Sequence, residues 1–158
     1  MSSPNRQALI QTIGHTIMRW QDATQKYDEA VGRTYDLNAS ERLCLSFLWT
    51  GPQTASAVAR QIGLTPAAVT ALIDRLEKRG FVRRKADPND RRKVLVEAAE
   101  QALRLTETAY LPLSVEGARM LDKYTDAELE TVAAFLSDSL ALQERMAKLL
   151  AERPALSR

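Results

Sequence analysis

Residues 63–96, GLTPAAVTALIDRLEKRGFVRRKADPNDRRKVLV, contain a helix with clear start and stop signals, followed by two short strand-like runs. Thr65 is a suitable N-cap, and Pro66 occupies the first helical position, where its missing N–H costs nothing. A glycine then ends the helix. The runs FVRRK (81–85) and RKVLVE (92–97) flank a turn of Asp, Pro, Asn and Asp. The stretch therefore predicts a capped helix and a basic β-hairpin.

A shorter helix is predicted directly before this stretch. It covers residues 56–62, and Gly63 ends it. Ala59, Gly63 and Val69 stand at relative positions 1, 5 and 11, which places a small residue, a tight turn and an apolar residue where two crossing helices meet. Joined to the basic hairpin, this spacing predicts a winged helix-turn-helix, a fold that inserts its second helix into a DNA major groove.

Long helices are predicted on both sides of this segment. Residues 6–35 repeat apolar side chains at three- and four-residue steps, as one long helix does. Asn38 caps a second helix, and a helical pattern over residues 98–121 contains Pro112, which should kink or break it near residues 110 and 111. A last helix opens at the capping residue Thr125. The predicted fold class is mainly α with a small β-hairpin, a winged helix-turn-helix plus long terminal dimerisation helices.

The domain prediction follows from these elements. We predict a winged helix-turn-helix DNA-binding domain over residues 37–97 and a helical dimerisation region over residues 1–36 and 98–158. The first and last helices carry apolar stripes that a small winged domain cannot cover alone. We therefore expect them to pair with those of a second copy in a two-fold symmetric homodimer.

Charge is distributed unevenly along the chain. The net charge is +2, but ten basic and four acidic residues lie between Arg60 and Lys93, so this window carries +6 and the remainder −4. A positive lobe on an acidic body is typical of a protein that binds nucleic acid. A charge run by itself is as often a solvated surface, so the hairpin context carries the interpretation.

Composition argues against several other classes of protein. The charged fraction is 27% and the hydrophobic fraction 45%, as in soluble globular domains, and no apolar run approaches the ~18 residues of a membrane span. The N-terminal sequence lacks the layout of a signal peptide, so we expect a cytoplasmic protein. With one histidine, one cysteine and no catalytic motif, we expect no enzyme, no cofactor and no metal. Cys44 is expected to be a buried, inert thiol.

Residues 52–96 resemble the MarR family of bacterial transcriptional regulators. The family pattern is a helix of the form L-T/S-x-x-x-V-T-x-L-I/V-D-R-L-E, then G-x-V/I-x-R, then a wing with D-P-x-D-R-R, and all three are present here. The resemblance implies a homodimer on a palindromic double-stranded DNA site. It also implies a regulator that is often released from DNA by a small aromatic ligand or by thiol oxidation.

The resemblance places DNA contacts on the second helix and on the wing. The expected DNA-binding residues are Thr65, Pro66, Ala67, Ala68, Thr70, Arg75, Arg84, Arg91 and Arg92. Arg92 is expected in the minor groove, and Arg75 at a phosphate or paired with a wing acid. Arg84 and Arg91 contact the DNA backbone or remain as solvated charge. Asp90 is expected to organise the wing by fixing an arginine through a bidentate pair.

The chain departs from the family pattern at two places. Ala67, Ala68 and Ala71 stand where many relatives have serine, arginine or lysine. An alanine can touch a thymine methyl but cannot read a donor–acceptor pattern, so we expect discrimination to rely on the threonines of the helix, the wing and DNA shape. The usual Leu-Thr after the wing is replaced by Glu-Ala-Ala at 97–99. The following helix is therefore expected to have a weaker or shifted cap.

A ligand pocket is the second site hypothesis. His15, Trp20, Tyr27 and Trp49 are candidates for it, although such an aromatic stripe is more often core and a lone histidine more often surface. The sequence favours a sequence-specific DNA-binding transcriptional regulator, a dimeric repressor released by a small aromatic or apolar ligand. An activator, a thiol-oxidation sensor of the same family and a winged-helix protein-interaction module remain alternatives.

Overall fold

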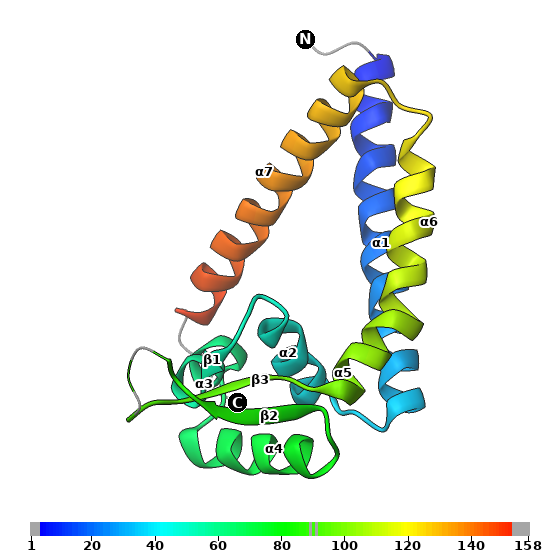
Figure 1. The fold of residues 1–158 in the computed structure, drawn as a ribbon. Helices are drawn as coiled ribbons and strands as arrows, with labels where there is room; N and C mark the ends of the chain where they lie inside the picture. The colour runs from blue at the N-terminus through cyan, green and yellow to red at the C-terminus, as the bar shows by residue number, and fades with distance from the viewer. Residues whose placement is uncertain (1–3, 89, 91, 153–158) are drawn as a thin grey trace. The chain divides into compact units, whose positions relative to one another are not determined.

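The computed structural model describes residues 4–88, 90 and 92–152, which form helices and one small sheet (Figure 1). The chain divides into two units, one up to Leu111 and one from Pro112 onward. The first unit contains α1 (Pro4–Tyr35), α2 (Ala39–Leu48), β1 (Gln53–Thr54), α3 (Ala55–Ile62), α4 (Pro66–Lys78), β2 (Val82–Ala86), β3 (Val94–Ala98), α5 (Glu100–Leu105) and a π-helical turn (Thr106–Tyr110). The second contains nearly all of α6 (Leu111–Leu121) and α7 (Asp126–Ala151). The predicted fold class is confirmed.

Helix starts follow the predicted caps. Asn38 Oδ1 accepts from the Glu41 N–H at 2.9 Å, while a Glu41 carboxylate oxygen accepts from the Asn38 N–H at 3.0 Å, which completes a capping box. Thr65 Oγ1 accepts from the Ala68 N–H at 3.3 Å, and Thr125 opens α7 with a second capping box. These three predicted N-caps are confirmed.

The helix-turn-helix has the packing that its spacing predicts. The axes of α3 and α4 meet at 109°, within the range usual for this motif. Ala59 and Val69 are buried between the helices, and Gly63 takes a left-handed conformation with φ of 69° at the end of α3. A side chain at that φ would be strained, so glycine makes the tight turn possible.

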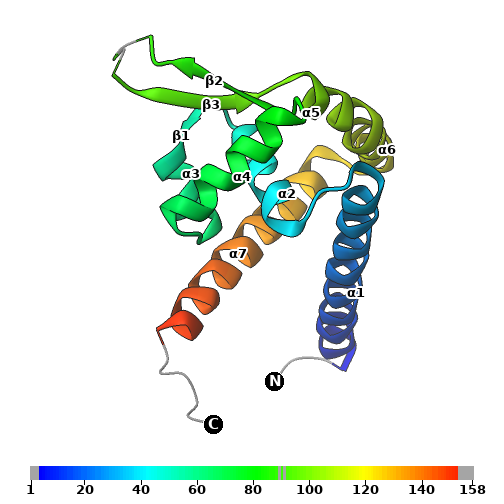
Figure 2. The same cartoon turned by 90° about the horizontal axis from the view of Figure 1, so that it is seen from below.

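The sheet has three antiparallel strands in the order β1-β3-β2. The predicted hairpin is present, but both predicted strands begin too early in the sequence. The Phe81 N–H still bonds to the Leu76 carbonyl at 2.9 Å, and the Lys93 N–H bonds to the Asp90 carbonyl at 2.8 Å within the turn. The sequence also missed β1, which is too short to produce a pattern and pairs Gln53 with Val96. The β2–β3 hairpin extends beyond α3 and α4 (Figure 2).

The helix does not break near residues 110 and 111. It widens into the π-helical turn just before that position. The Leu111 N–H bonds to the Thr106 carbonyl, one residue further back than in an α-helix. Because Pro112 has no N–H and its ring would crowd the Thr108 carbonyl, a widened turn lets the helix continue. The Ala99 N-cap of α5 makes no side-chain hydrogen bond, as expected from the missing Leu-Thr.

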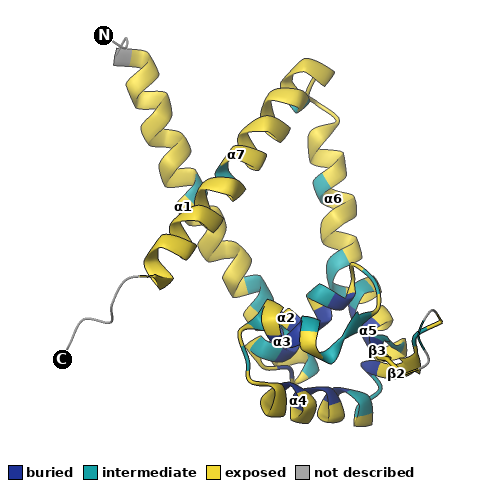
Figure 3. Ribbon diagram, turned by 90° about the vertical axis from the view of Figure 1, so that its left-hand side faces the viewer, coloured by how far each residue is buried: buried dark blue, intermediate teal, exposed yellow. Residues whose placement is uncertain are grey.

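The core lies between α2, α3, α4 and the sheet. Its largest fully buried side chains are Leu72, Ile73, Leu76, Val58, Val69, Val82, Val96 and Cys44. In contrast, α6, α7 and the N-terminal part of α1 are exposed over most of their length (Figure 3). Apolar side chains stand exposed on them, such as Leu9 and Trp20 on α1 and Phe135 on α7. The homodimer that would cover these stripes, and the domain division built on it, stay predictions.

Among the described residues, no single helix has the length and apolar character needed to cross a membrane. The bent pair α3 and α4 would meet that test by length and composition alone.

Candidate nucleic-acid interface

Helix α4 separates an apolar buried stripe from an exposed face. Val69, Leu72, Ile73 and Leu76 are each at most 1% exposed and fix the helix on the core. The side chains exposed over its cap and first turns are Thr65, Pro66, Ala67, Ala68, Thr70 and Ala71. All five residues that the resemblance placed at the start of this helix therefore lie on its exposed face.

Both threonines of that face are already bonded within the helix. Thr65 Oγ1 caps α4 by accepting from the Ala68 N–H. The Thr70 hydroxyl donates to the Pro66 carbonyl at 3.0 Å. Neither hydroxyl is therefore fully available to a base edge. The face has correspondingly fewer groups that could recognise a base through hydrogen bonds.

Opposite charges across the two strands hold the base of the wing. Arg83 lies opposite Glu97 in the β2–β3 register, and its Nε is 2.7 Å from a Glu97 carboxylate oxygen. Lys85 pairs with the other oxygen of the same carboxylate. Hydrogen bonds from Lys85 and then Arg83 lower the pKa of Glu97. This carboxylate therefore stays ionised at neutral pH and keeps both cations on the hairpin.

Asp90 contacts Arg92 at the tip of the wing through one carboxylate oxygen and Lys93 through the other. Its Oδ1 accepts from the Arg92 backbone N–H at 3.1 Å and from Arg92 Nε at 3.4 Å, and its Oδ2 lies 3.7 Å from Lys93 Nζ. Arg92 is not held by a bidentate pair, because its Nε and its backbone N–H meet the same oxygen. The Arg92 side chain stays 93% exposed. Arg91 lies outside the described residues.

Arg84 ties the wing to α4. One of its terminal nitrogens lies 2.5 Å from Asp74 Oδ1, and the other pairs with Glu77. The hydrogen bond to Asp74 is the main reason why the pKa of Arg84 is raised. Arg84, expected to contact DNA or to be solvated, is thus paired with two carboxylates, and its side chain is only 32% exposed.

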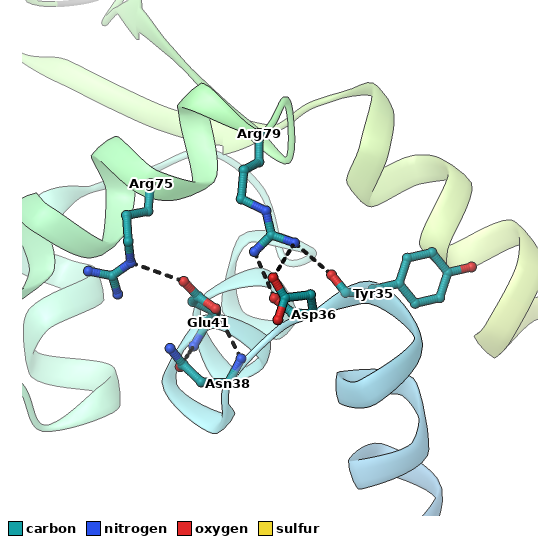
Figure 4. Close-up of polar contacts among 6 residues, drawn as sticks. All are labelled: Tyr35, Asp36, Asn38, Glu41, Arg75 and Arg79. Carbon is teal, nitrogen blue, oxygen red and sulfur yellow. Dashed lines mark hydrogen bonds and ion pairs between the residues drawn. The ribbon is translucent and has the colours of Figure 1, made fainter.

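Arg79 joins α4 to the end of α1 and the residues that follow it, here called the elbow (residues 35–38), and Arg75 joins α4 to α2 (Figure 4). Arg75 Nε bonds to the buried carboxylate of Glu41 at 3.3 Å, so its acidic partner is on α2 and not on the wing. Arg79 donates to the carbonyls of Tyr35 and Asp36, each at 2.7 Å. Sequence reasoning did not single out Arg79. Its only local signal is a cation at the end of a helix.

A cavity of about 530 Å³ lies beside the elbow. The residues that line it are Asp28, Val31, Leu37, Ala39, Arg42, Leu43, Leu45, Ser46, Trp49, Ala102, Leu105, Thr106 and Tyr110. The Tyr110 hydroxyl donates to Asp28 at 3.1 Å. Burial, followed by the charge of Asp28, raises the pKa of Tyr110 to about 12. The cavity is mostly apolar, with one cation, Arg42, and one carboxylate, Asp28, in its wall.

The predicted ligand residues are only partly gathered there. Trp49 lines the cavity. Tyr27 lies behind its wall, where its ring meets that of Tyr110 edge-on at 6.1 Å and its hydroxyl donates to the Ala109 carbonyl. His15 and Trp20 are exposed residues of α1 that do not line the cavity. Arg42, which the sequence did not single out, has the charge that an anionic ligand requires.

Cys44 is fully buried in α2, and burial followed by the charge of Glu41 raises its pKa to about 11. Because the thiolate is the reactive form, we expect iodoacetamide at pH 8 to label the native protein at least ~100-fold more slowly than urea-unfolded protein. The measurement is a labelling time course followed by mass spectrometry. Equal rates in the two states would favour the thiol-sensor alternative.

Among the residues that the structure describes, no group of three or more His, Cys, Asp or Glu side chains is placed to hold a metal ion.

Comparison with known proteins agrees with this architecture. Residues 37–94 match the model of the MarR family. The HTH-type transcriptional regulator YcgE of Bacillus subtilis is 37% identical over 94 residues, 60% of this chain and 61% of YcgE, so the chain spans about three fifths of that relative's length. Among solved structures, Streptococcus pneumoniae FabT in complex with DNA has a TM-score of 0.66 at 18% identity, covering 87% of this chain and 99% of FabT. CouR from Rhodococcus jostii RHA1, bound to p-coumaroyl-CoA, has a TM-score of 0.53 at 25% identity, covering 78% of this chain and 88% of CouR.

Proposed function

We propose that this chain, whose residues 37–94 match the model of the MarR family, is a cytoplasmic, homodimeric, non-enzymatic regulator of transcription that binds a palindromic DNA site. The observation that carries this proposal is the exposed face of α4 beside a wing whose tip holds a 93% exposed arginine, Arg92. A helix of this kind enters a major groove, and a neighbouring arginine reaches the minor groove.

The proposed mode of action is repression relieved by a ligand. In a dimer, two α4 helices must lie about 34 Å apart to enter successive major grooves. A ligand that favours another separation weakens binding by its differential affinity for the two arrangements. CouR, whose solved structure contains p-coumaroyl-CoA, supports a role for a small aromatic acid or its derivative.

The cavity is the proposed ligand site. An anionic head would pair with Arg42 and an apolar or aromatic body would pack against Trp49. Leu37 belongs both to the cavity wall and to the elbow that Arg79 holds against α4. This connection gives a bound ligand a physical route to the recognition helix.

The test of DNA binding is fluorescence anisotropy with the duplex upstream of the protein's own gene, a scrambled duplex, and a duplex selected in vitro from a random library. Tight, salt-dependent binding of the selected duplex at two subunits per site supports the proposal. If selection enriches no sequence and no duplex binds even at low salt, a protein-interaction module becomes the better interpretation.

Arg92→Ala is expected to weaken binding of the selected duplex and to reduce the slope of log K against log salt by about one, because one phosphate-neutralising cation is lost. The matched control is Arg19→Ala, which removes the same charge from an exposed position on α1. Titrations at four or more salt concentrations give both slopes. If the salt slope of Arg92→Ala equalled that of the control, Arg92 would not contact DNA.

A further inference from the structure

We propose that α4 selects its DNA half-site through the 5-methyl groups of pyrimidines, so that it accepts thymine and 5-methylcytosine alike and discriminates against uracil and cytosine. This inference rests on the proposed function, because it requires α4 to enter the major groove. It goes beyond that function by naming the chemical group on the DNA that the helix reads.

The geometry of α4 puts methyl groups at the centre of the exposed face. Side chains on a helix are separated by about 100° per residue. The buried stripe of Val69, Leu72 and Ile73 therefore places Ala67 and Ala71, four residues apart, on the opposite side. Both are exposed and end in a single methyl group. The part of the helix that would approach the base edges most closely is apolar.

The polar groups that flank these methyls are largely committed elsewhere. The Thr70 hydroxyl proton is used by the Pro66 carbonyl, and the Thr65 oxygen caps the helix. About two turns beyond Ala67, the Asp74 carboxylate is held by Arg84 at 2.5 Å. These contacts leave few donors and acceptors near the start of α4 for reading a base by hydrogen bonds.

Arg75 does not change this picture, because it lies at the edge of the face. Its Nε bonds to Glu41, and its side chain lines a shallow groove together with the N-terminal residues of α2. A cation at the edge of the face suits a phosphate contact better than a base contact.

The apolar partner for these alanines follows from the chemistry of the groove. Among the four standard base pairs, only thymine presents an apolar group in the major groove, its C5-methyl. A 5-methylcytosine places the same methyl at the same position of a C·G pair. Since burying one methyl(ene) group is worth a factor of about four in affinity, each lost methyl contact is expected to cost about four-fold.

The experiment replaces methyls one at a time in the selected duplex. Deoxyuridine at a contacted thymine is expected to weaken binding about four-fold, and deoxyuridine in the flanking sequence to have no effect. At the same contacted position, a C·G pair with 5-methylcytosine is expected to bind about four-fold tighter than an unmethylated C·G pair. Equal affinities for thymine and uracil at every half-site position would overturn the inference, while tight binding of the duplex itself would leave the proposed function standing.

Protein variants assign the effect to the two alanines. Ala67→Ser and Ala71→Ser change exposed positions and should leave the fold intact, as circular dichroism can verify. Each is expected to bring the thymine-to-uracil affinity ratio toward one at one base position. The matched control is Ala23→Ser, an exposed alanine of α1, which should keep the ratio at about four. A ratio unchanged in both α4 variants would show that other groups read the methyls.

Discussion

Arg79→Met is expected to lower the free energy of unfolding by about 2–3 kcal/mol, since it removes two charge-assisted hydrogen bonds while keeping an apolar side chain of similar length. The two bonds, at 2.7 Å each, satisfy the carbonyls of Tyr35 and Asp36 where α1 ends. Carbonyls at a helix C-terminus have no intrahelical partner, and a cation there also interacts favourably with the helix dipole. The guanidinium additionally lies 5.2 Å from the centre of the Phe81 ring.

The expected cost stays below that of a buried charge network because the elbow is partly open to water. Asp36 is exposed, and about a third of the Arg79 side chain is exposed, so water replaces part of what the arginine provided. Arg79→Lys should fall between the wild type and Arg79→Met, because one ammonium group cannot reproduce the planar fork that reaches both carbonyls.

Urea denaturation at a fixed protein concentration measures these differences. The matched control is Arg60→Met, which makes the same replacement at an exposed position of α3 and should change stability by less than about 0.5 kcal/mol. If Arg79→Met cost no more than this control, the elbow would not depend on the arginine.

Local signals account for the parts of the fold that the sequence predicted. Asn38 and Thr65 stop helices from extending backward through bonds to residues three positions away, so the relevant atoms are neighbours in the sequence. The helix-turn-helix spacing is local as well, because a single turn joins its two helices. Such features can be predicted from a single sequence without knowledge of the rest of the fold.

Contacts between distant segments were not predictable in the same way. Arg79 meets carbonyls 43 and 44 positions earlier in the chain, and Arg75 meets a carboxylate 34 positions earlier. Arginine-rich runs indicated a basic lobe, but not that Arg84 is paired with two acids of α4. Charge counting cannot distinguish a cation that faces a ligand from one that holds two elements together.

The ligand-site prediction shows the limit of periodicity. Helical spacing identified a face of α1 but gave no position along its axis. At a rise of 1.5 Å per residue, His15 lies about 20 Å along the helix from Asp28, which lines the cavity. The cavity forms only where α1 meets α2 and α5. The position of the cavity along the axis of α1 therefore depends on the tertiary fold.

The second large effect is expected at Gly32, in the part of α1 that approaches the elbow. Glycine inside a helix is normally about 1 kcal/mol worse than alanine. At this position, however, an added Cβ would lie 2.8 Å from the Leu37 carbonyl oxygen and even closer to an Arg42 terminal nitrogen. The arginine can move, but the carbonyl belongs to the backbone of the elbow. Gly32→Ala is therefore expected to destabilise the protein by about 2–3 kcal/mol.

The clash also breaks a specific interaction. The same Arg42 nitrogen donates to the Leu37 carbonyl at 3.1 Å, and the Leu37 N–H donates to the Gly32 carbonyl at 2.8 Å. Displacing Arg42 therefore removes a charge-assisted bond and moves the cation of the cavity wall. Gly32→Ala should therefore lower the free energy of unfolding. In buffer without urea, where the variant is folded, it should also bind anionic aromatic ligands more weakly than the wild type does.

Gly14→Ala is the matched control in the same helix, where an added Cβ meets no atom within 4 Å. It should raise the free energy of unfolding by about 0.5–1 kcal/mol through helix propensity alone. Thermal and urea unfolding of the two variants at one protein concentration should thus give opposite signs for the same added methyl. A stabilising Gly32→Ala would mean that the elbow yields easily and does not hold α4 in place. A destabilising Gly14→Ala would instead indicate that a second copy packs against this position of α1.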